Sequence, residues 1–139
     1  MKEHARIGAD IIGEHEGGLL AVARTIALTH HEQWNGGGYP HGLAGEAIPI
    51  EGRIASIADV YDALVSERPY KAAWSSDDAA AEIIRGSGRA FDPNLVALFI
   101  ALRPEFKGIW ERYADPSRAA ELAISHTHSP SHRVDDVPV

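Results

Sequence analysis

Apolar residues recur along most of the chain at intervals of three and four positions, which is the spacing of one face of an α-helix. No segment shows the strict alternation of apolar and polar residues that is typical of a half-buried strand. The pattern predicts helices over residues 4–15, 18–32 and 52–66, and two further helices that begin near Ser75 and Asp92. The predicted fold class is therefore all-α.

The predicted helix over residues 18–32 is apolar on nearly every side, so we expect it to lie at the centre of the fold, with neighbours all round. In the helix over 4–15, the isoleucines at positions 7, 11 and 12 share one side. In the helix over 52–66 the apolar positions repeat with a clear 3.6-residue period: Ile54, Ile57, Ala58, Tyr61, Leu64 and Val65.

Sequence signals mark the ends of the two later helices. Ser75 and Asp78 resemble a capping box in which aspartate replaces glutamate, and a glycine at position 86 or 88 ends that helix. Asp92 is followed by proline, the pattern of an N-cap with proline at the first helical position, and Pro104 ends the helix. The expected buried stripe of the last helix is Leu95, Val96, Phe99 and Ile100.

Two segments lack helical periodicity. Residues 33–50 contain five glycines and two prolines and are predicted to form a structured loop, with a turn at Asn35-Gly36. The chain becomes polar after residue 115, so we expect one domain over residues 1–115 and a disordered tail over 116–139. A metal-binding role is the alternative for the tail, because it holds His126, His128 and His132.

Composition narrows the functional class. Thirteen Lys and Arg residues against twenty Asp and Glu residues give a formal net charge of −7, which argues against binding to nucleic acid polymers. The chain has no cysteine, so disulfides, thiolate metal sites and cysteine nucleophiles are excluded. No apolar run is long enough to span a membrane and the N-terminus does not resemble a signal peptide, so the expected location is the cytoplasm.

The strongest local feature is His30-His31-Glu32, which lies between the apolar helix and the glycine-rich loop. One interpretation is structural, with imidazoles that interact with the last carbonyls of the helix. The other is a metal site; because adjacent helical residues point about 100° apart, the two rings would serve two neighbouring ions rather than one.

Asp59 lies on a helical face that it shares with Asp62, away from the apolar stripe. It could belong to a solvated face beside Arg53, Arg68 or Lys71, or it could be an oxygen ligand that completes a histidine and carboxylate set suited to Fe, Mn or Zn. His4 is a candidate fourth ligand, although its neighbours alone fit a surface histidine.

Two further groups are candidates for contact with a phosphate. In Arg68-Pro69-Tyr70-Lys71 the proline favours a turn that presents two cations, either to a phosphate or to solvent. Tyr39, before Pro40, could present its hydroxyl to the same site or pack the loop in place.

Over a longer stretch the sequence resembles the C-terminal part of an HD-GYP domain of the HD phosphohydrolase superfamily. The resemblance rests on three segments: HHEQWNGGGYPHGLAGEAIPIEGRIASIADVYDAL, SERPYKAAW and GRAFDPNLVALFI. It implies a helical bundle of the HD phosphohydrolase type and a phosphodiesterase that hydrolyses cyclic di-GMP to pGpG or GMP. The implied cofactors are divalent metal ions, Fe or Mn, two or three in the complete site.

The resemblance also implies roles for single residues. The metal ligands would be His4, His30, His31 and Asp59, and the catalytic or substrate-binding residues would be Tyr39, Arg68 and Lys71. Asn35 replaces the aspartate of the family pattern, so we expect the shape of the loop to persist and the interactions of that side chain to weaken.

The His-Asp dyad that defines the family does not occur in the 139 residues, so we expect a domain truncated at its N-terminus and an incomplete catalytic site. Two near-octahedral cations need on the order of ten ligand positions, of which four residues are implied here. Uncovered helix surface would then favour an oligomer. The alternative function is a non-catalytic interaction module in cyclic di-GMP signalling, whose partner would be a diguanylate cyclase or receiver domain.

Overall fold

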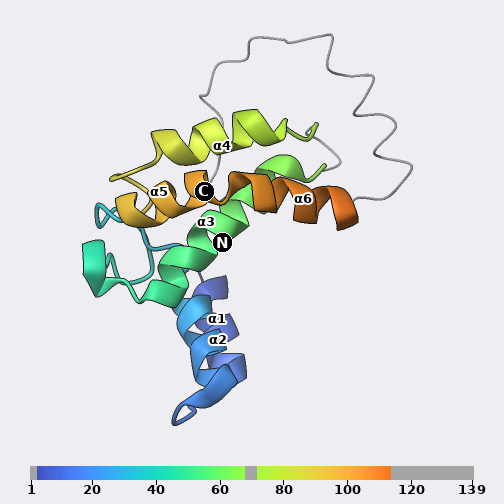
Figure 1. Cartoon of the computed structure of the whole chain (residues 1–139). Helices are drawn as coiled ribbons and strands as arrows, with labels where there is room; N and C mark the ends of the chain where they lie inside the picture. Colours follow the sequence, from blue (N-terminus) through green and yellow to red (C-terminus); the bar gives the residue numbers. More distant parts are fainter. Residues whose placement is uncertain (1–2, 68–71, 114–139) are drawn as a thin grey trace. The chain divides into compact units, whose positions relative to one another are not determined.

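The computed structural model describes residues 3–67 and 72–113 of the chain. This part contains six α-helices, one 3-10 helix and no strand, so the all-α prediction is confirmed. The helices are α1 His4–Ile12, α2 Gly18–Thr29, η1 Gly45–Ala47, α3 Ile50–Val65, α4 Ser76–Arg85, α5 Pro93–Ala101 and α6 Arg103–Tyr113 (Figure 1). Helices α1 to α5 belong to one compact unit that ends at Leu102, and α6 belongs to a second unit.

Helices α1 and α2 form a hairpin, and α2 packs in turn on α3 (Figure 1). Ala5 and Ala9 are the buried residues of α1, and such small side chains let helices approach closely. Ile7 and Ile11 are 48% and 80% exposed, so the side of α1 that carries its isoleucines is not the packed side.

The second helix is not enclosed on every side within the part of the chain that the structure describes. Thr29 is the buried residue of α2, whereas Leu19 and Leu20 are 83% and 51% exposed. The exposure agrees with the expectation of uncovered apolar surface, and the oligomer derived from it stays a prediction. The helix is also shorter than predicted, because it ends at Thr29 and not at Glu32.

The main hydrophobic core lies between α3, α4 and α5. On α3 the predicted period holds for Ile57, Leu64 and Val65, which are buried, but Ile54 is half exposed. On α5 the predicted stripe is wrong at Ile100, which is 45% exposed. The buried core cluster comprises Ile57, Ala80, Ile83, Phe91, Val96 and Phe99.

The predicted helix starts are confirmed. The Ser75 side chain accepts a hydrogen bond from the Asp78 amide at 3.0 Å, and Gly86 follows the last residue of α4. The Asp92 carboxylate accepts one from the Asn94 amide at 2.8 Å and opens α5. Pro104 does not end this helix; it lies in the first turn of α6, where proline is tolerated because the amide has no partner in the helix.

The predicted boundary at residue 115 and the tail over 116–139, with its three histidines, lie outside the described residues. Among the helices that the structure describes, none combines the length and the hydropathy needed to cross a bilayer.

Candidate metal centre

The end of α2 sets the geometry of the histidine pair. His30 is the C-cap residue of the helix, and its backbone amide still donates to the Ile26 carbonyl. His31 follows in a turn, outside the regular helix. His30 keeps helical backbone angles, with φ −67° and ψ −15°, and the centroids of the His30 and His31 rings nevertheless lie only 4.0 Å apart. One ion within reach of both imidazoles is compatible with this geometry, and the choice between one ion and two stays a prediction.

The first helix brings a third imidazole to the same place. The His4 ring lies edge-on to the rings of His30 and His31, with centroids 5.7 and 4.8 Å away. The Nε2 atoms of His4 and His31 are 2.8 Å apart. One ring nitrogen from each of the three residues can be chosen so that all three lie within 4.8 Å of one another. The packing of α1 on α2 thus assembles a group of three nitrogen donors.

Hydrogen bonding orients His30. Its Nδ1 lies 2.8 Å from the Ile26 carbonyl oxygen and 3.1 Å from that of Ala27. A carbonyl oxygen only accepts, so Nδ1 donates to it, and in the neutral ring Nε2 then has the lone pair. A backbone carbonyl that receives the second ring N–H is a usual support for a metal-binding histidine. His30 can therefore contact the helix carbonyls and act as a metal ligand at the same time.

The surroundings of His31 favour the neutral form of its ring, which is the form that binds metals. Burial is the largest cause that lowers its pKa below the usual 6.5, followed by the nearby rings of His30 and His4. The ring of Tyr39 stacks on it, with centroids 4.7 Å apart and planes inclined by 26°. The Tyr39 ring therefore packs against the histidine group. This contact is consistent with the predicted role in which the side chain packs the loop in place.

Asp59 lies on α3 with an exposed side chain. Its negative charge partly opposes the lowering of the His31 pKa, and it adds to the effect of burial in raising the pKa of Tyr39. The carboxylate is thus within electrostatic reach of both rings, although the group of mutually close donors comprises the histidines alone. Arg53, one of the three cations considered as neighbours of Asp59, pairs with Asp92 at 2.7 Å.

Arg68 and Lys71, the two predicted phosphate contacts, lie outside the described residues. Asn35 adopts the predicted turn: its side-chain oxygen accepts a hydrogen bond from the Gly37 amide at 2.9 Å, and Gly36 has a φ of 82°. The shape expected for the loop is confirmed there.

Sequence reasoning missed two polar groups that shape the site. Glu32 is 2% exposed and accepts hydrogen bonds from the loop amides of His41 and Leu43. Asp92 was predicted only as a helix cap, but it also binds Arg53, whose guanidinium lies 5.9 Å from the centroid of the Trp34 ring. The available signal was a charged residue at the junction between an apolar helix and a glycine-rich loop.

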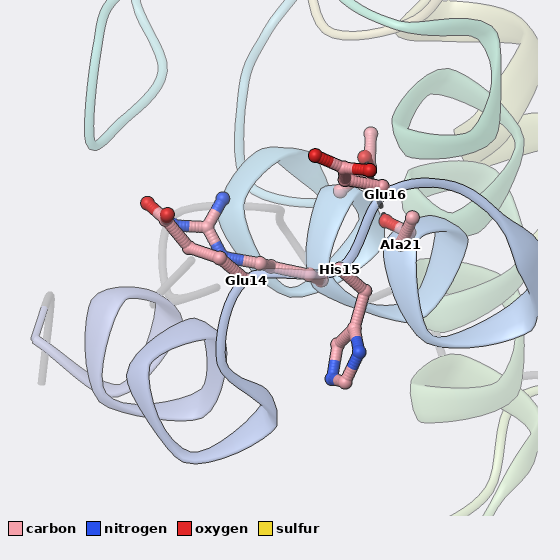
Figure 2. A pocket seen from close by; sticks show the side chains of 6 residues that line it. Glu14, His15, Glu16 and Ala21 are labelled. Carbon is pink, nitrogen blue, oxygen red and sulfur yellow. Dashed lines mark hydrogen bonds between the residues drawn. The ribbon is translucent and has the colours of Figure 1, made fainter.

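A hollow of about 500 Å³ lies at the turn between α1 and α2 (Figure 2). It is open and polar, and the three clustered histidines are not among its lining residues. These are Glu14, His15, Glu16, Ala21, Arg24 and Thr25. The hollow is therefore separate from the candidate metal centre.

The donor set fits a transition-metal cation. Three imidazoles converge, one from α1 and two from the segment that directly follows α2. One of them donates to a carbonyl that orients its ring, and another has a lowered pKa. Imidazole suits Zn, Cu, Fe and Ni, and a nearby carboxylate widens the choice to Mn. The fold and this group of side chains define a helical protein with three clustered histidines that could hold a metal ion.

Comparison with known proteins shows the family to which the chain belongs. The model of the HD domain family matches residues 1–95, so the chain belongs to that family. A cyclic di-GMP phosphodiesterase of Vibrio cholerae is 52% identical over 120 residues, which cover 83% of this chain and 24% of that protein. A cyclic di-GMP phosphodiesterase of Thermotoga maritima is 39% identical over 137 residues, or 99% of this chain and 37% of that protein.

A solved structure agrees with the fold. The crystal structure of a cyclic GMP-AMP specific phosphodiesterase of Vibrio cholerae superposes with a TM-score of 0.64 at 29% identity, over 87% of this chain and 27% of that one. The chain thus spans about a quarter to a third of the length of these relatives. The resemblance to HD phosphohydrolases is confirmed, and enzymes of that superfamily are generally metal-dependent.

Proposed function

We propose that this chain forms part of a metal-dependent phosphodiesterase that hydrolyses cyclic di-GMP to pGpG or GMP. The observation that carries the proposal is the convergence of His4, His30 and His31, because three imidazoles at one point are a metal-binding arrangement. The names of the two Vibrio and Thermotoga relatives supply the reaction and the substrate class.

In this proposal His4, His30, His31 and Asp59 hold the divalent cations, with Fe or Mn as the metal and two or three ions in the complete site. A divalent cation supplies Lewis acidity, which activates water and stabilises charge that develops on a phosphoryl group. Tyr39 would contact the substrate from its position against the His31 ring. Two cations of the chain, Arg68 and Lys71, would contact the phosphates of the substrate.

The four proposed ligands fill a minority of the coordination positions that two or three cations need, on the order of ten for two near-octahedral ions with a shared bridge. We therefore expect slow hydrolysis by the 139 residues alone. Loss of a single donor that stabilises transition-state charge already costs about a hundredfold to a thousandfold in rate.

Two substrates must be compared, because the relatives are named for two. The solved structure is of a cyclic GMP-AMP specific enzyme, whereas the two curated relatives are named for cyclic di-GMP. These dinucleotides share two phosphodiesters and differ in one base. We place cyclic di-GMP first because the more similar of these proteins carry that name.

The test is incubation of the chain with Mn²⁺ or Fe²⁺ and each dinucleotide, with products separated by chromatography. We expect pGpG or GMP above the metal blank, and its loss in His31→Ala. His15→Ala is the matched control, because His15 is exposed and its ring contacts the Ile12 carbonyl outside the three-histidine group. No product above the blank would refute catalysis by this chain, and faster turnover of 3′3′-cyclic GMP-AMP would reassign the substrate.

The second candidate is a non-catalytic interaction module, with a diguanylate cyclase or receiver domain as partner. The observation in its favour is that no His-Asp dipeptide occurs among the 139 residues. Metal analysis of the purified chain separates the two. Less than about one bound ion per chain, unchanged by His30→Ala and His31→Ala, would support the module, because a cation site on these residues would then be absent.

A further inference from the structure

Glu32 is a buried carboxylate that the proposed chemistry does not use. It directly follows His31, and only 2% of its surface is exposed. Its Oε1 accepts a hydrogen bond from the backbone amide of His41 at 2.7 Å, and its Oε2 accepts one from the amide of Leu43 at 2.9 Å. Each oxygen of one side chain thus holds a different residue of the glycine-rich loop.

The two amides are the partners that compensate for burial of this side chain. Among the described residues, no ion pair connects Glu32 to a lysine, arginine or histidine. A carboxylate removed from water is costly unless its oxygens are hydrogen-bonded, and bonds from backbone amides to a charged acceptor are among the stronger ones. The loop and the carboxylate therefore stabilise each other. If the loop moved away, the carboxylate and the two loop amides would lose these hydrogen bonds.

The same loop lies directly on the histidine segment. A Cβ on Gly38 would lie 2.5 Å from the Glu32 Cα, so only glycine permits this approach. The next residue donates its amide to the His31 carbonyl at 3.1 Å, and its ring stacks on the His31 imidazole. The anchor at Glu32 and the stacked ring of Tyr39 are thus connected through a few tightly packed residues.

We propose that Glu32 is a positioning residue of the metal centre: its carboxylate fixes the loop, the loop holds Tyr39 against His31, and the stacked ring keeps His31 turned toward His4. The effect on metal affinity rests on the proposed function of the three histidines. The effect on the loop does not, because it requires neither metal nor substrate.

The test compares Glu32→Gln with Glu46→Gln in the full chain without metal. Glutamine keeps the shape but replaces one acceptor oxygen with an NH₂ group, which would face a backbone N–H, so one of the two bonds is lost. Glu46 is the matched control because it is an exposed glutamate of the same loop. Hydrogen exchange measured by NMR reports on the His41 and Leu43 amides directly.

We expect exchange of these two amides to accelerate about tenfold or more in Glu32→Gln, with the His31 ring resonances shifted. The amide of Ile83, in the core, should exchange as in the unsubstituted chain, and Glu46→Gln should change none of these signals. On titration with Mn²⁺, Glu32→Gln should bind about tenfold to a hundredfold more weakly, the range for residues that support metal ligands.

Unchanged exchange at His41 and Leu43 would overturn the proposal. Equal acceleration at Ile83 would also overturn it, since Glu32 would then support the whole fold rather than the loop. If the glutamine variant does not fold, Glu32→Asp replaces it: the charge is kept, the reach is shorter by one methylene, and the loop amides should again exchange faster than Ile83. Absence of hydrolysis by the unsubstituted chain would refute catalysis by this chain, and the exchange results would still test the role of Glu32.

Discussion

The Nε2 atoms of His4 and His31 face each other at 2.8 Å, although 27 positions separate the two residues in the chain. At that distance only one of the two nitrogens carries a proton, because two N–H groups directed at each other repel. A hydrogen bond between the two rings places one proton between the two nitrogens. A metal cation could take the place of that proton. The arrangement depends on the packing of α1 on α2, so the centre exists only in the folded chain.

Removal of either member of this pair should weaken metal binding. We expect His4→Ala and His31→Ala each to lower the affinity for Mn²⁺ by at least about tenfold, since loss of a supporting residue alone costs that much. Isothermal titration calorimetry measures the affinity, and His15→Ala should bind as the unsubstituted chain does. Equal affinity in all four proteins would place the cation elsewhere.

The lowered pKa of His31 predicts how the metal-free chain responds to acid. Burial keeps the folded-state pKa of this residue below the 6.5 of an unfolded chain. As the pH falls through about 6.5, the unfolded state binds a proton that the folded state does not, so the free energy of unfolding decreases. The loss should stop below the folded-state pKa, where both states are protonated.

Urea unfolding in the presence of a chelator, at several pH values around 6.5, measures this dependence. His31→Ala should show a weaker pH dependence than the unsubstituted chain, because the residue that takes up the proton is gone. His15→Ala serves as the comparison, and a slope equally reduced in that variant would contradict the assignment to His31.

The helix starts and the candidate metal ligands are predictable from different kinds of sequence information. Helix starts follow from local chemistry, so the caps at Ser75 and Asp92 are predictable from a few neighbouring residues. The convergence of His4 with His30 is not a local property. Periodicity leaves His4 as a surface histidine, and only the resemblance to a family assigns it to the same centre.

What the sequence does not predict is which apolar positions are packed. On α1 the contact is made by Ala5 and Ala9, while the larger Ile7 and Ile11 face outward. Hydrophobicity scales favour the isoleucines, but close packing of helices depends on the size and shape of the side chains at the contact. Burial of Glu32 is unexpected for a related reason, because its two hydrogen-bond donors lie nine and eleven residues away in a loop.

The close contact between α2 and α3 predicts a strong effect of Gly52→Ala. A Cβ at this position would meet the Thr29 side chain, 2.8 Å from its Cβ, and the Thr29 hydroxyl is held by the Thr25 carbonyl at 2.6 Å. The Thr29 side chain therefore cannot move aside without disturbing that hydrogen bond. Overpacking of this kind costs about 1–3 kcal/mol of stability. Because Thr29 precedes His30, the displaced helix should also weaken Mn²⁺ binding.

Thermal unfolding followed by circular dichroism gives the stability of Gly52→Ala, and calorimetry gives its affinity for Mn²⁺. Gly108→Ala is the matched control: a Cβ there would meet nothing within 4 Å, so the better helix propensity of alanine should leave stability equal or raise it by up to about 1 kcal/mol. A Gly52→Ala variant as stable as the control would refute the close contact.

Asp92 should be the more costly of the two helix caps to remove. Its side chain is 3% exposed; one oxygen caps α5 and the other binds Arg53. Asp92→Ala would leave the Arg53 guanidinium, itself largely buried, without its counter-charge, and breaking a buried pair in this way costs about 3–5 kcal/mol. Ser75→Ala removes an exposed cap and should cost only about 1 kcal/mol, both values being measurable by urea unfolding. Equal losses in the two variants would mean that the pair with Arg53 adds nothing beyond capping.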